Sequence, residues 1–158
     1  MATLTVTLTE DLTLNGYQQG STNSFSISSI TQVTKRIITV PASADTTIAT
    51  FQAAQSTSDV AIDLEAVKYI RVTNLESSNS CNLSLQIAGA EGGTANMSTT
   101  ILLEAGKSFI LGTIHDGIAT SDANATIVTS LTDLESLLVD GGSNAIQLEV
   151  LVASVNDA

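Results

Sequence analysis

The sequence contains very few of the residues that carry most protein chemistry. It has one cysteine, one histidine and no tryptophan among 158 residues. A single cysteine cannot form an intrachain disulfide, and a zinc site needs several Cys or His ligands. Covalent catalysis needs a nucleophile with a base within reach, and these counts leave few combinations. We therefore expect no enzyme activity, no cofactor and no metal ion.

The scarce residues themselves have simple structural interpretations. His115 precedes Asp116 in an expected loop, where an isolated His-Asp pair is typical of a solvated surface. Cys81 stands at the start of an apolar strand, where a free cysteine usually packs as a small hydrophobic residue. Aromatic residues make up only 3% of the chain, which leaves little for the ring platforms of sugar-binding sites. These residues favour a protein without an active site.

Two further sequence patterns could indicate a binding site: a group of acidic residues and a glycine-rich segment. Asp59, Asp63 and Glu65 could offer oxygen atoms to calcium, but the Asp-x-Asp-x-Asp-Gly loop is absent, so a solvated turn is favoured. Residues 89–93 are rich in glycine but lack the Gly-Lys-Ser/Thr of a phosphate-binding loop. We interpret them as a hairpin turn.

Basic residues are also scarce: there are five, against 16 acidic residues, for a net charge of −11. This balance argues against nucleic-acid binding, which needs a surface of basic side chains that contact the phosphate groups. The simplest role of the charge is solubility, but the basic positions could instead mark an interface. These candidate interface positions are Lys35, Arg36, Lys68, Arg71 and Lys107.

No apolar run approaches the length of a membrane span, and the first residues lack the basic and apolar regions of a signal peptide. We therefore expect a chain that is made in the cytoplasm and does not bind a membrane.

The residues that are abundant favour strands. Ser and Thr are frequent, the apolar residues are mostly aliphatic, and they alternate with polar residues over many short segments. In residues 69–75, Ile70, Val72 and Asn74 share one face and Arg71 lies on the other. Together with residues 82–87, 99–103 and 107–111, this segment predicts an antiparallel meander. Further strands are predicted over residues 3–9, 24–28, 33–40, 125–129 and 145–152. Residues 46–51 could be a strand or one turn of helix, and their β-branched content favours a strand. Asn15-Gly16 predicts a tight turn, because both residues tolerate positive φ.

One segment favours a helix instead. Leucines at positions 131, 134, 137 and 138 have helical spacing, and Thr132 to Glu135 matches a capping box. The chain as a whole is predicted to be one domain, residues 1–158, with an all-β fold. The expected architecture is an antiparallel two-sheet sandwich of the jelly-roll type with one short helix near the C-terminus.

Three segments also carry a resemblance: residues 35–41 (Lys-Arg-Ile-Ile-Thr-Val-Pro), 68–75 (Lys-Tyr-Ile-Arg-Val-Thr-Asn-Leu) and 104–111 (Glu-Ala-Gly-Lys-Ser-Phe-Ile-Leu). With the threonine-rich start and residues 148–155, they resemble a group of small virion proteins of tailed bacteriophages, especially marine ones. The resemblance implies a capsid decoration (cement) protein on the capsid exterior, bound to the major capsid protein and often trimeric. A tail or head-fibre component and a non-viral ligand-binding β-sandwich module are the alternatives.

Two expectations about contacts follow. Two aliphatic faces are larger than a sheet with one solvated face needs, so we expect a homo-oligomer, with a trimer favoured. The residues of these faces are Leu83, Leu85, Ile87, Ile146, Leu148 and Val150. Arg71 points away from Ile70 and Val72, either into solvent or toward a carboxylate across the sheet or across a subunit contact.

Overall fold

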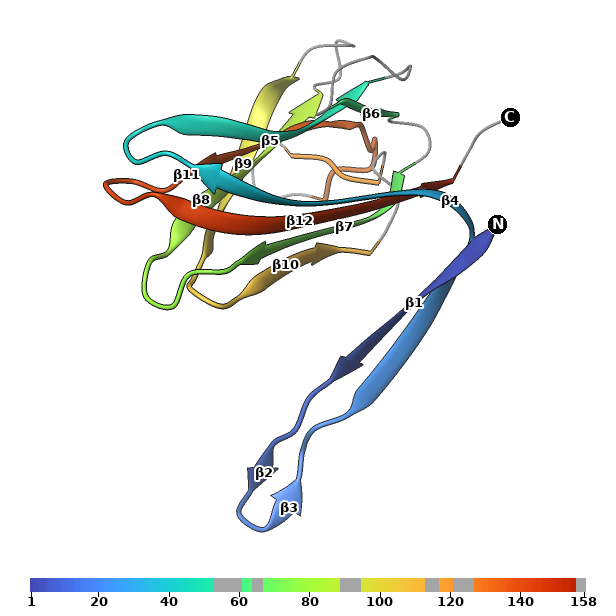
Figure 1. The fold of residues 1–158 in the computed structure, drawn as a ribbon. Helices are drawn as coiled ribbons and strands as arrows, with labels where there is room; N and C mark the ends of the chain where they lie inside the picture. The colour runs from blue at the N-terminus through green and yellow to red at the C-terminus, as the bar shows by residue number, and fades with distance from the viewer. Residues whose placement is uncertain (53–60, 64–66, 89–94, 113–116, 121–126, 156–158) are drawn as a thin grey trace.

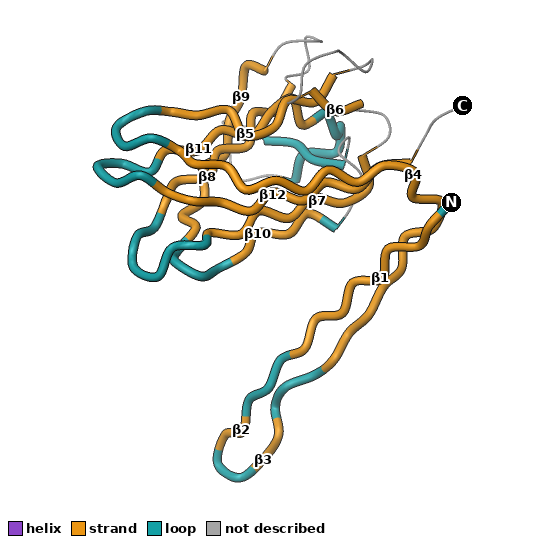
Figure 2. Tube along the Cα trace, viewed as in Figure 1, coloured by secondary structure: helices purple, strands orange, loops and turns teal. Residues whose placement is uncertain are grey.

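The computed structural model describes residues 1–52, 61–63, 67–88, 95–112, 117–120 and 127–155. All twelve regular elements in these residues are β-strands, which confirms the all-β prediction. The strands form two five-stranded sheets and one two-stranded hairpin (Figures 1 and 2).

The two large sheets are called sheet I and sheet II. Sheet I contains, in spatial order, β1 (Ala2–Thr9), β4 (Thr22–Val40), β12 (Ile146–Val155), β7 (Val67–Asn74) and β10 (Ser108–Leu111). Sheet II contains β6 (Ala61–Asp63), β5 (Asp45–Gln52), β11 (Leu134–Asp140), β8 (Cys81–Ala88) and β9 (Ala95–Leu103). The small hairpin contains β2 (Thr13–Leu14) and β3 (Tyr17–Gln18). Neighbouring strands in these sheets are antiparallel except β5 and β6, which are parallel.

Most strands of the two large sheets pair in a nested order. If β1, β6 and the small hairpin are set aside, eight strands remain, and the first of them (β4) pairs with the last (β12). The second pairs with the seventh (β5 with β11), the third with the sixth (β7 with β10) and the fourth with the fifth (β8 with β9). We call these eight strands the body of the protein.

The core of the body is aliphatic and draws on both sheets. Alternate residues are buried along most of β7, β8 and β12, as the period of two in the sequence predicts. In sheet I these include Ile70, Val72 and Leu148, and in sheet II Leu83 and Leu137, all members of one hydrophobic cluster. Burial of such side chains stabilises the fold by roughly 1.5–3 kcal/mol each. One continuous core therefore joins the two sheets.

The predicted meander is present as strands but wrong in its pairing. β7, β8, β9 and β10 lie close to the predicted ranges, yet consecutive strands pair only between β8 and β9. β7 and β10 pair with each other in sheet I, while β8 and β9 belong to sheet II. The turns from β7 to β8 and from β9 to β10 thus cross from one sheet to the other. Alternation in a sequence gives the two faces of a strand but not its neighbours.

The predicted helix near the C-terminus is wrong, because residues 134–140 form β11. The register of β11 shifts between Leu134 and Ser136 against β8, and between Leu137 and Leu138 against β5. Such β-bulges insert one extra residue into a strand. The shift against β8 adds the extra residue to β11 and so places Leu134 and Leu137 on the same buried side although they are three residues apart. An apolar spacing of three therefore arises here from a bulged strand.

The residues around this segment also differ from the prediction. Thr132 does not cap a helix; its backbone N–H donates to the carbonyl oxygen of Ile118 at 2.8 Å, and the two residues form an isolated bridge. The strand predicted over residues 125–129 is not seen in its described part, residues 127–129.

The first thirty residues form a projecting ribbon. β4 pairs with β1 as far as Ile30 and with β12 from Ile30 to Val40, so one long strand belongs to both the ribbon and the body. We call residues 2–30 the arm. The arm extends away from the body, and β2 and β3 lie at its far end (Figures 1 and 2). The predicted Asn15-Gly16 turn is confirmed, with positive φ angles of 52° and 81°.

Candidate functional site

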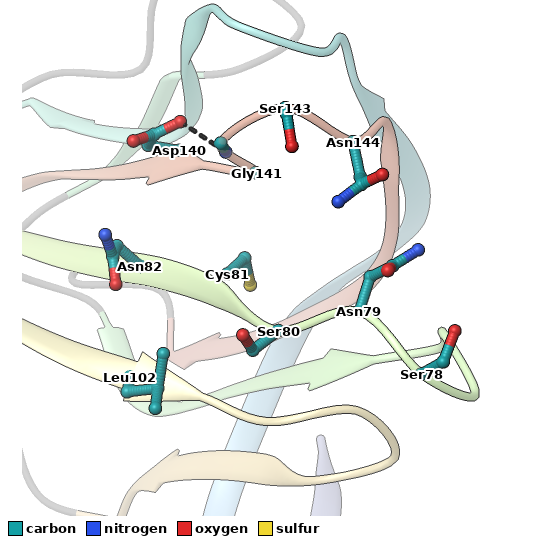
Figure 3. Close-up of a pocket in the computed structure, with 11 residues that line it drawn as sticks. Ser78, Asn79, Ser80, Cys81, Asn82, Leu102, Asp140, Gly141, Ser143 and Asn144 are labelled. Carbon is teal, nitrogen blue, oxygen red and sulfur yellow. Dashed lines mark hydrogen bonds between the residues drawn. The ribbon is translucent and has the colours of Figure 1, made fainter.

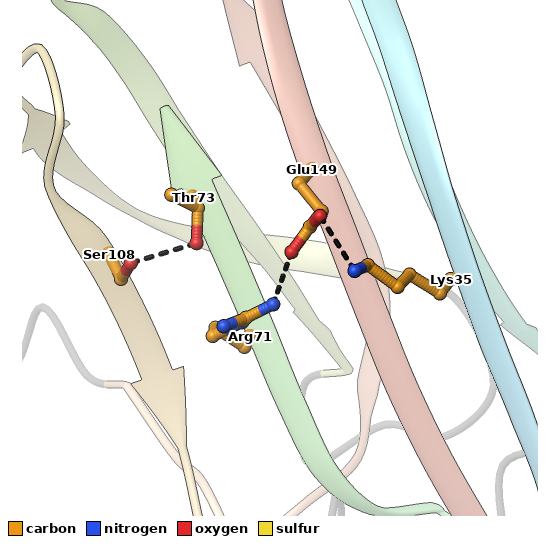
Figure 4. Close-up of polar contacts among 5 residues, drawn as sticks. All are labelled: Lys35, Arg71, Thr73, Ser108 and Glu149. Carbon is orange, nitrogen blue, oxygen red and sulfur yellow. Dashed lines mark hydrogen bonds and ion pairs between the residues drawn. The ribbon is translucent and has the colours of Figure 1, made fainter. Parts of the chain in front are cut away.

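The outer face of sheet I carries a cluster of charged side chains. Glu149 lies on the central strand β12, between Lys35 on β4 and Arg71 on β7 (Figure 4). Lys35 Nζ lies 3.0 Å from Glu149 Oε2, and Arg71 Nη2 donates to Glu149 Oε1. Of the alternatives open for Arg71, the structure shows the pair with a carboxylate across the sheet, and the partner lies in the same chain.

The three other candidate basic residues do not join this cluster in the part of the chain that the structure describes. Arg36 is half-buried and follows Lys35 on β4. It therefore lies on the opposite face of the strand from Lys35, the face of the inward-facing Val40. Lys68 is half-buried near the start of β7, and Lys107 is exposed just before β10. That these five residues mark an interface with another molecule stays a prediction.

Charge is divided unequally between the two sheets. The strands of sheet I contain four of the five basic residues and one acid, Glu149, and Lys107 directly precedes β10. The strands of sheet II contain no basic residue. Their acids are Asp45, Asp63, Glu135 and Asp140. Sheet I is therefore the basic side of an acidic protein.

The arm has one apolar face, which the sequence could not place. Leu4 and Val6 of β1 lie opposite Ile27 and Phe25 of β4, and Leu8 continues the same face. Further out the apolar side chains are largely exposed; Tyr17, in the hairpin at the tip, is 72% exposed. The other exposed apolar residues of this outer part are Leu8, Leu12 and Leu14.

The opposite face of the arm is lined with hydroxyl groups. The Thr5 and Ser26 oxygens are 3.1 Å apart, and those of Thr7 and Ser24 are 3.0 Å apart, so cross-strand hydrogen bonds join them. These pairs support the register in which β1 and β4 pair. The threonine-rich start of the sequence is accounted for by this face.

The base of the arm packs on the outer face of sheet I. Leu4, Val6 and Ile27 contact a second, smaller cluster around Tyr69 and Ala153. Phe25 lies against the backbone where β10 ends, because a Cβ placed on Gly112 would be 3.1 Å from Phe25 Cζ. The apolar face of the arm is therefore covered by its own body near the base and uncovered toward the tip.

The aliphatic faces that were expected to form an interface lie in the core. Leu83, Leu85 and Ile87 of β8 are at most 3% exposed, and Ile146, Leu148 and Val150 of β12 at most 2%. The expected surplus of apolar surface on these strands was wrong, because their apolar side chains belong to one shared hydrophobic cluster. Exposed apolar side chains lie elsewhere: several are on the arm, and others are Val33, Ile37, Leu75, Leu102, Ile127 and Leu131.

A polar pocket of about 310 Å³ lies between the turn after β7 and the turn after β11 (Figure 3). Its lining includes Asn79, Asn82, Ser143 and Asn144. Asp140 Oδ1 accepts a hydrogen bond of 2.6 Å from the Gly142 backbone N–H, which holds the β11–β12 turn. This pocket offers amide and hydroxyl groups that could bind a small polar molecule.

Cys81 borders the same pocket but is not poised as a nucleophile. Burial raises the pKa of its thiol, and the nearby Asp140 carboxylate raises it further. A thiol with a raised pKa stays protonated at neutral pH and reacts slowly. The expectation that Cys81 packs as a small hydrophobic residue is confirmed by its 3% exposure.

Several predicted features lie outside the described residues. They are His115, Asp116, Asp59, Glu65 and the turn at residues 89–93, and of Asp63 only the backbone is described. Among the residues that the structure does describe, no three His, Cys, Asp or Glu side chains are grouped as metal ligands. The same residues include no helix long and apolar enough to cross a membrane.

Comparisons with models of protein families, with curated proteins and with solved structures gave no match to this chain.

Proposed function

We propose that the body is a two-sheet sandwich with jelly-roll topology. In a jelly roll the chain folds as a long hairpin that is rolled up, so its first strand pairs with its last and its middle strands with each other. The nested pairing from β4–β12 inward to β8–β9 supports this assignment, as does the core shared by the two sheets. Such folds occur in viral capsid and lectin domains, so the fold fits both a virion structural protein and a ligand-binding module.

The proposed function is that of a bacteriophage virion structural protein, a capsid decoration (cement) protein that stabilises the head shell. The observation that carries this proposal is the arm. A ribbon with Leu8, Leu12, Leu14 and Tyr17 exposed is unfavourable in water, and exposed apolar patches are typical of surfaces that bind another protein. The resemblance of residues 35–41, 68–75 and 104–111 to phage virion proteins supports the same class.

In this proposal the chain lies on the capsid exterior, binds the major capsid protein and forms a homo-oligomer, with a trimer favoured. It does not turn over a substrate and needs no cofactor. Its effect is thermodynamic: a protein that binds only the assembled shell stabilises that shell by mass action. No nucleic acid or membrane is involved.

The test uses purified phage particles from which this protein has been stripped. Stripped particles should release their DNA at a lower temperature than intact ones, measured with a DNA-binding dye during heating, and adding the protein back should restore the release temperature. A matched variant replaces residues 10–21 by Asn-Gly, a two-residue hairpin turn that joins Thr9 directly to Thr22. This tip-shortened variant should restore less, because the exposed Leu12, Leu14 and Tyr17 are missing.

A different outcome would favour the first alternative. If stripped particles are as heat-resistant as intact ones but no longer adsorb to cells, the chain is a tail or head-fibre component. The second alternative, a non-viral ligand-binding module, is favoured only by the polar pocket near Asn79 and Asn144. Saturable binding of a sugar that is lost in Asn144→Ala would support it.

A further inference from the structure

The arm and the outer face of sheet I have complementary charges. Glu10 and Asp11 near the tip are the only charged side chains in residues 1–34. On the outer face of sheet I, Lys35 and Arg71 share the single carboxylate of Glu149, which leaves one positive charge in excess. In a chain with a net charge of −11, this face is the basic surface best placed to bind an acidic segment.

The two surfaces also match in apolar character. On β4, Val33 and Ile37 lie on either side of Lys35 and are 59% and 65% exposed. β1 pairs with β4 only as far as Ile30, so among the described strands residues 33–40 have a neighbour on one side only. The uncovered part of this face thus combines two aliphatic side chains with a lysine.

A contact between the apolar face of the arm and the outer face of sheet I already exists within one chain. The base of the arm packs its apolar face on the outer face of sheet I, around Tyr69 and Ala153. The outer part of the arm continues the same apolar face, and residues 33–37 continue the same side of the sheet. Each surface is therefore the uncovered extension of a surface that is covered in the monomer.

We propose that the acidic, apolar tip of the arm docks on the outer face of sheet I of a second copy, beside Val33, Lys35 and Ile37. This inference rests on the proposed self-association of the chain but not on its place on a virion. Each copy has one tip and one accepting face. Because these are different surfaces, the association closes as a ring or as a reciprocal dimer, in which every copy both gives and receives an arm.

The first test measures the mass of the purified protein by light scattering over micromolar concentrations. The wild type should be a closed oligomer, and E10K/D11K should weaken association about tenfold or more because like charges then meet. The control is Asp45→Lys with Glu104→Lys, which makes the same change in net charge at two exposed residues outside sheet I. This control should associate as the wild type does.

The second test exchanges the charges. Lys35→Glu alone should also weaken association, whereas combining it with E10K/D11K should restore the oligomer. Restoration shows that the variants fold and that the two sites meet. A third measurement mixes the Leu14→Cys variant with the Ile37→Cys variant and oxidises the mixture. A disulfide between the two variants should form much faster than a disulfide between two copies of the same variant.

Three results would overturn the inference. They are a monomeric wild type throughout the micromolar range, E10K/D11K associating as tightly as the control, or no restoration by the charge exchange. None of them bears on the particle experiment, which measures binding to a shell. Equally, a negative particle experiment leaves the oligomer of the free protein to be measured directly.

Discussion

At the scale of single residues, Asn74 connects the two sheets. It is fully buried at the end of β7, and its side-chain amide donates to the carbonyl oxygens of Asn79 at 2.9 Å and Leu103 at 3.1 Å. Its Oδ1 accepts from the Glu76 backbone N–H at 3.0 Å. A buried polar group with this many partners holds the turns on either side in place.

We predict that Asn74→Ala destabilises the protein by about 2–4 kcal/mol, because it leaves buried backbone groups without partners. Denaturant unfolding followed by circular dichroism measures the loss. Asn82→Ala is the control, since Asn82 is an exposed residue on β8 and its replacement should change the free energy of unfolding by less than about 0.5 kcal/mol. Equal losses in both variants would contradict the role given to Asn74.

The shared carboxylate of Glu149 gives a second prediction at this scale. Arg71→Ala should cost about 0.5–1 kcal/mol, and Lys35→Ala less than about 0.5 kcal/mol. The order follows from exposure, which is 57% for the Lys35 side chain and 31% for that of Arg71. Thermal unfolding at low and high salt measures both losses, and both should shrink as salt screens the charges. A larger loss for Lys35→Ala would show that exposure does not rank the two pairs.

Part of this site could be predicted from the sequence. The alternation of Ile70, Arg71 and Val72 correctly placed Arg71 on the outer face, because a period of two is a local property of a strand. Its partner Glu149 is 78 residues away in the chain. Nothing local identifies that partner, because the pairing depends on β12 lying between β4 and β7.

At the scale of elements, a β-bulge sets the point where the arm leaves the body. Ala2 pairs with Ile30 but Leu4 pairs with Ile27, so β4 has one residue more than β1 between these pairs. Ser29, inside the bulge, has a φ of 62°, in the left-handed region that L residues rarely adopt. A bulge bends its strand and increases its twist, which lets β4 belong to both the arm and the body.

We predict that Ser29→Val loosens the arm, because a β-branched residue at this φ costs about 1–2 kcal/mol. Amide hydrogen exchange of β1 should become about tenfold faster, while exchange in β8 stays unchanged. Ser29→Gly should keep or slow the exchange of β1. Ser28→Val, at the neighbouring exposed residue, is the control and should have little effect. If both valine variants behave alike, strain at Ser29 does not anchor the arm.

The sequence predicted most strands but not their environment. Alternation identified β1, β7, β8 and β12, β-branched content identified β5, and Asn15-Gly16 identified the turn of the arm. A bulge against β8 made the prediction for β11 wrong, because it changes the spacing of Leu134 and Leu137 from two to three. The exposure of Leu8 could not be predicted either, since alternation marks an apolar face but does not say whether another sheet covers it.

At the scale of the whole molecule, the outer arm lies apart from the hydrophobic clusters that hold the body together. Residues 10–21 have no described contact with the body clusters, whereas the base of the arm does. We predict that replacing residues 10–21 by Asn-Gly leaves the free energy of unfolding within about 0.5 kcal/mol of the wild type at concentrations where both are monomeric. Thermal unfolding measures this, and a large loss of stability would show that the tip is part of the folded core.

The nested order of strand pairing also has a consequence for how the chain acquires its structure. The hairpin of β1 and β4 is local in sequence and can form while the rest is still being synthesised, as can the pair β8–β9. Sheet I cannot close at that stage, since β12 must insert between β4 and β7. Folds dominated by such distant pairings acquire their structure slowly, in milliseconds to seconds. Until β12 pairs with β4 and β7, the apolar inner faces of these two strands can associate wrongly with other chains. The pairing of the last strand therefore ends the period in which the chain is prone to misassociation.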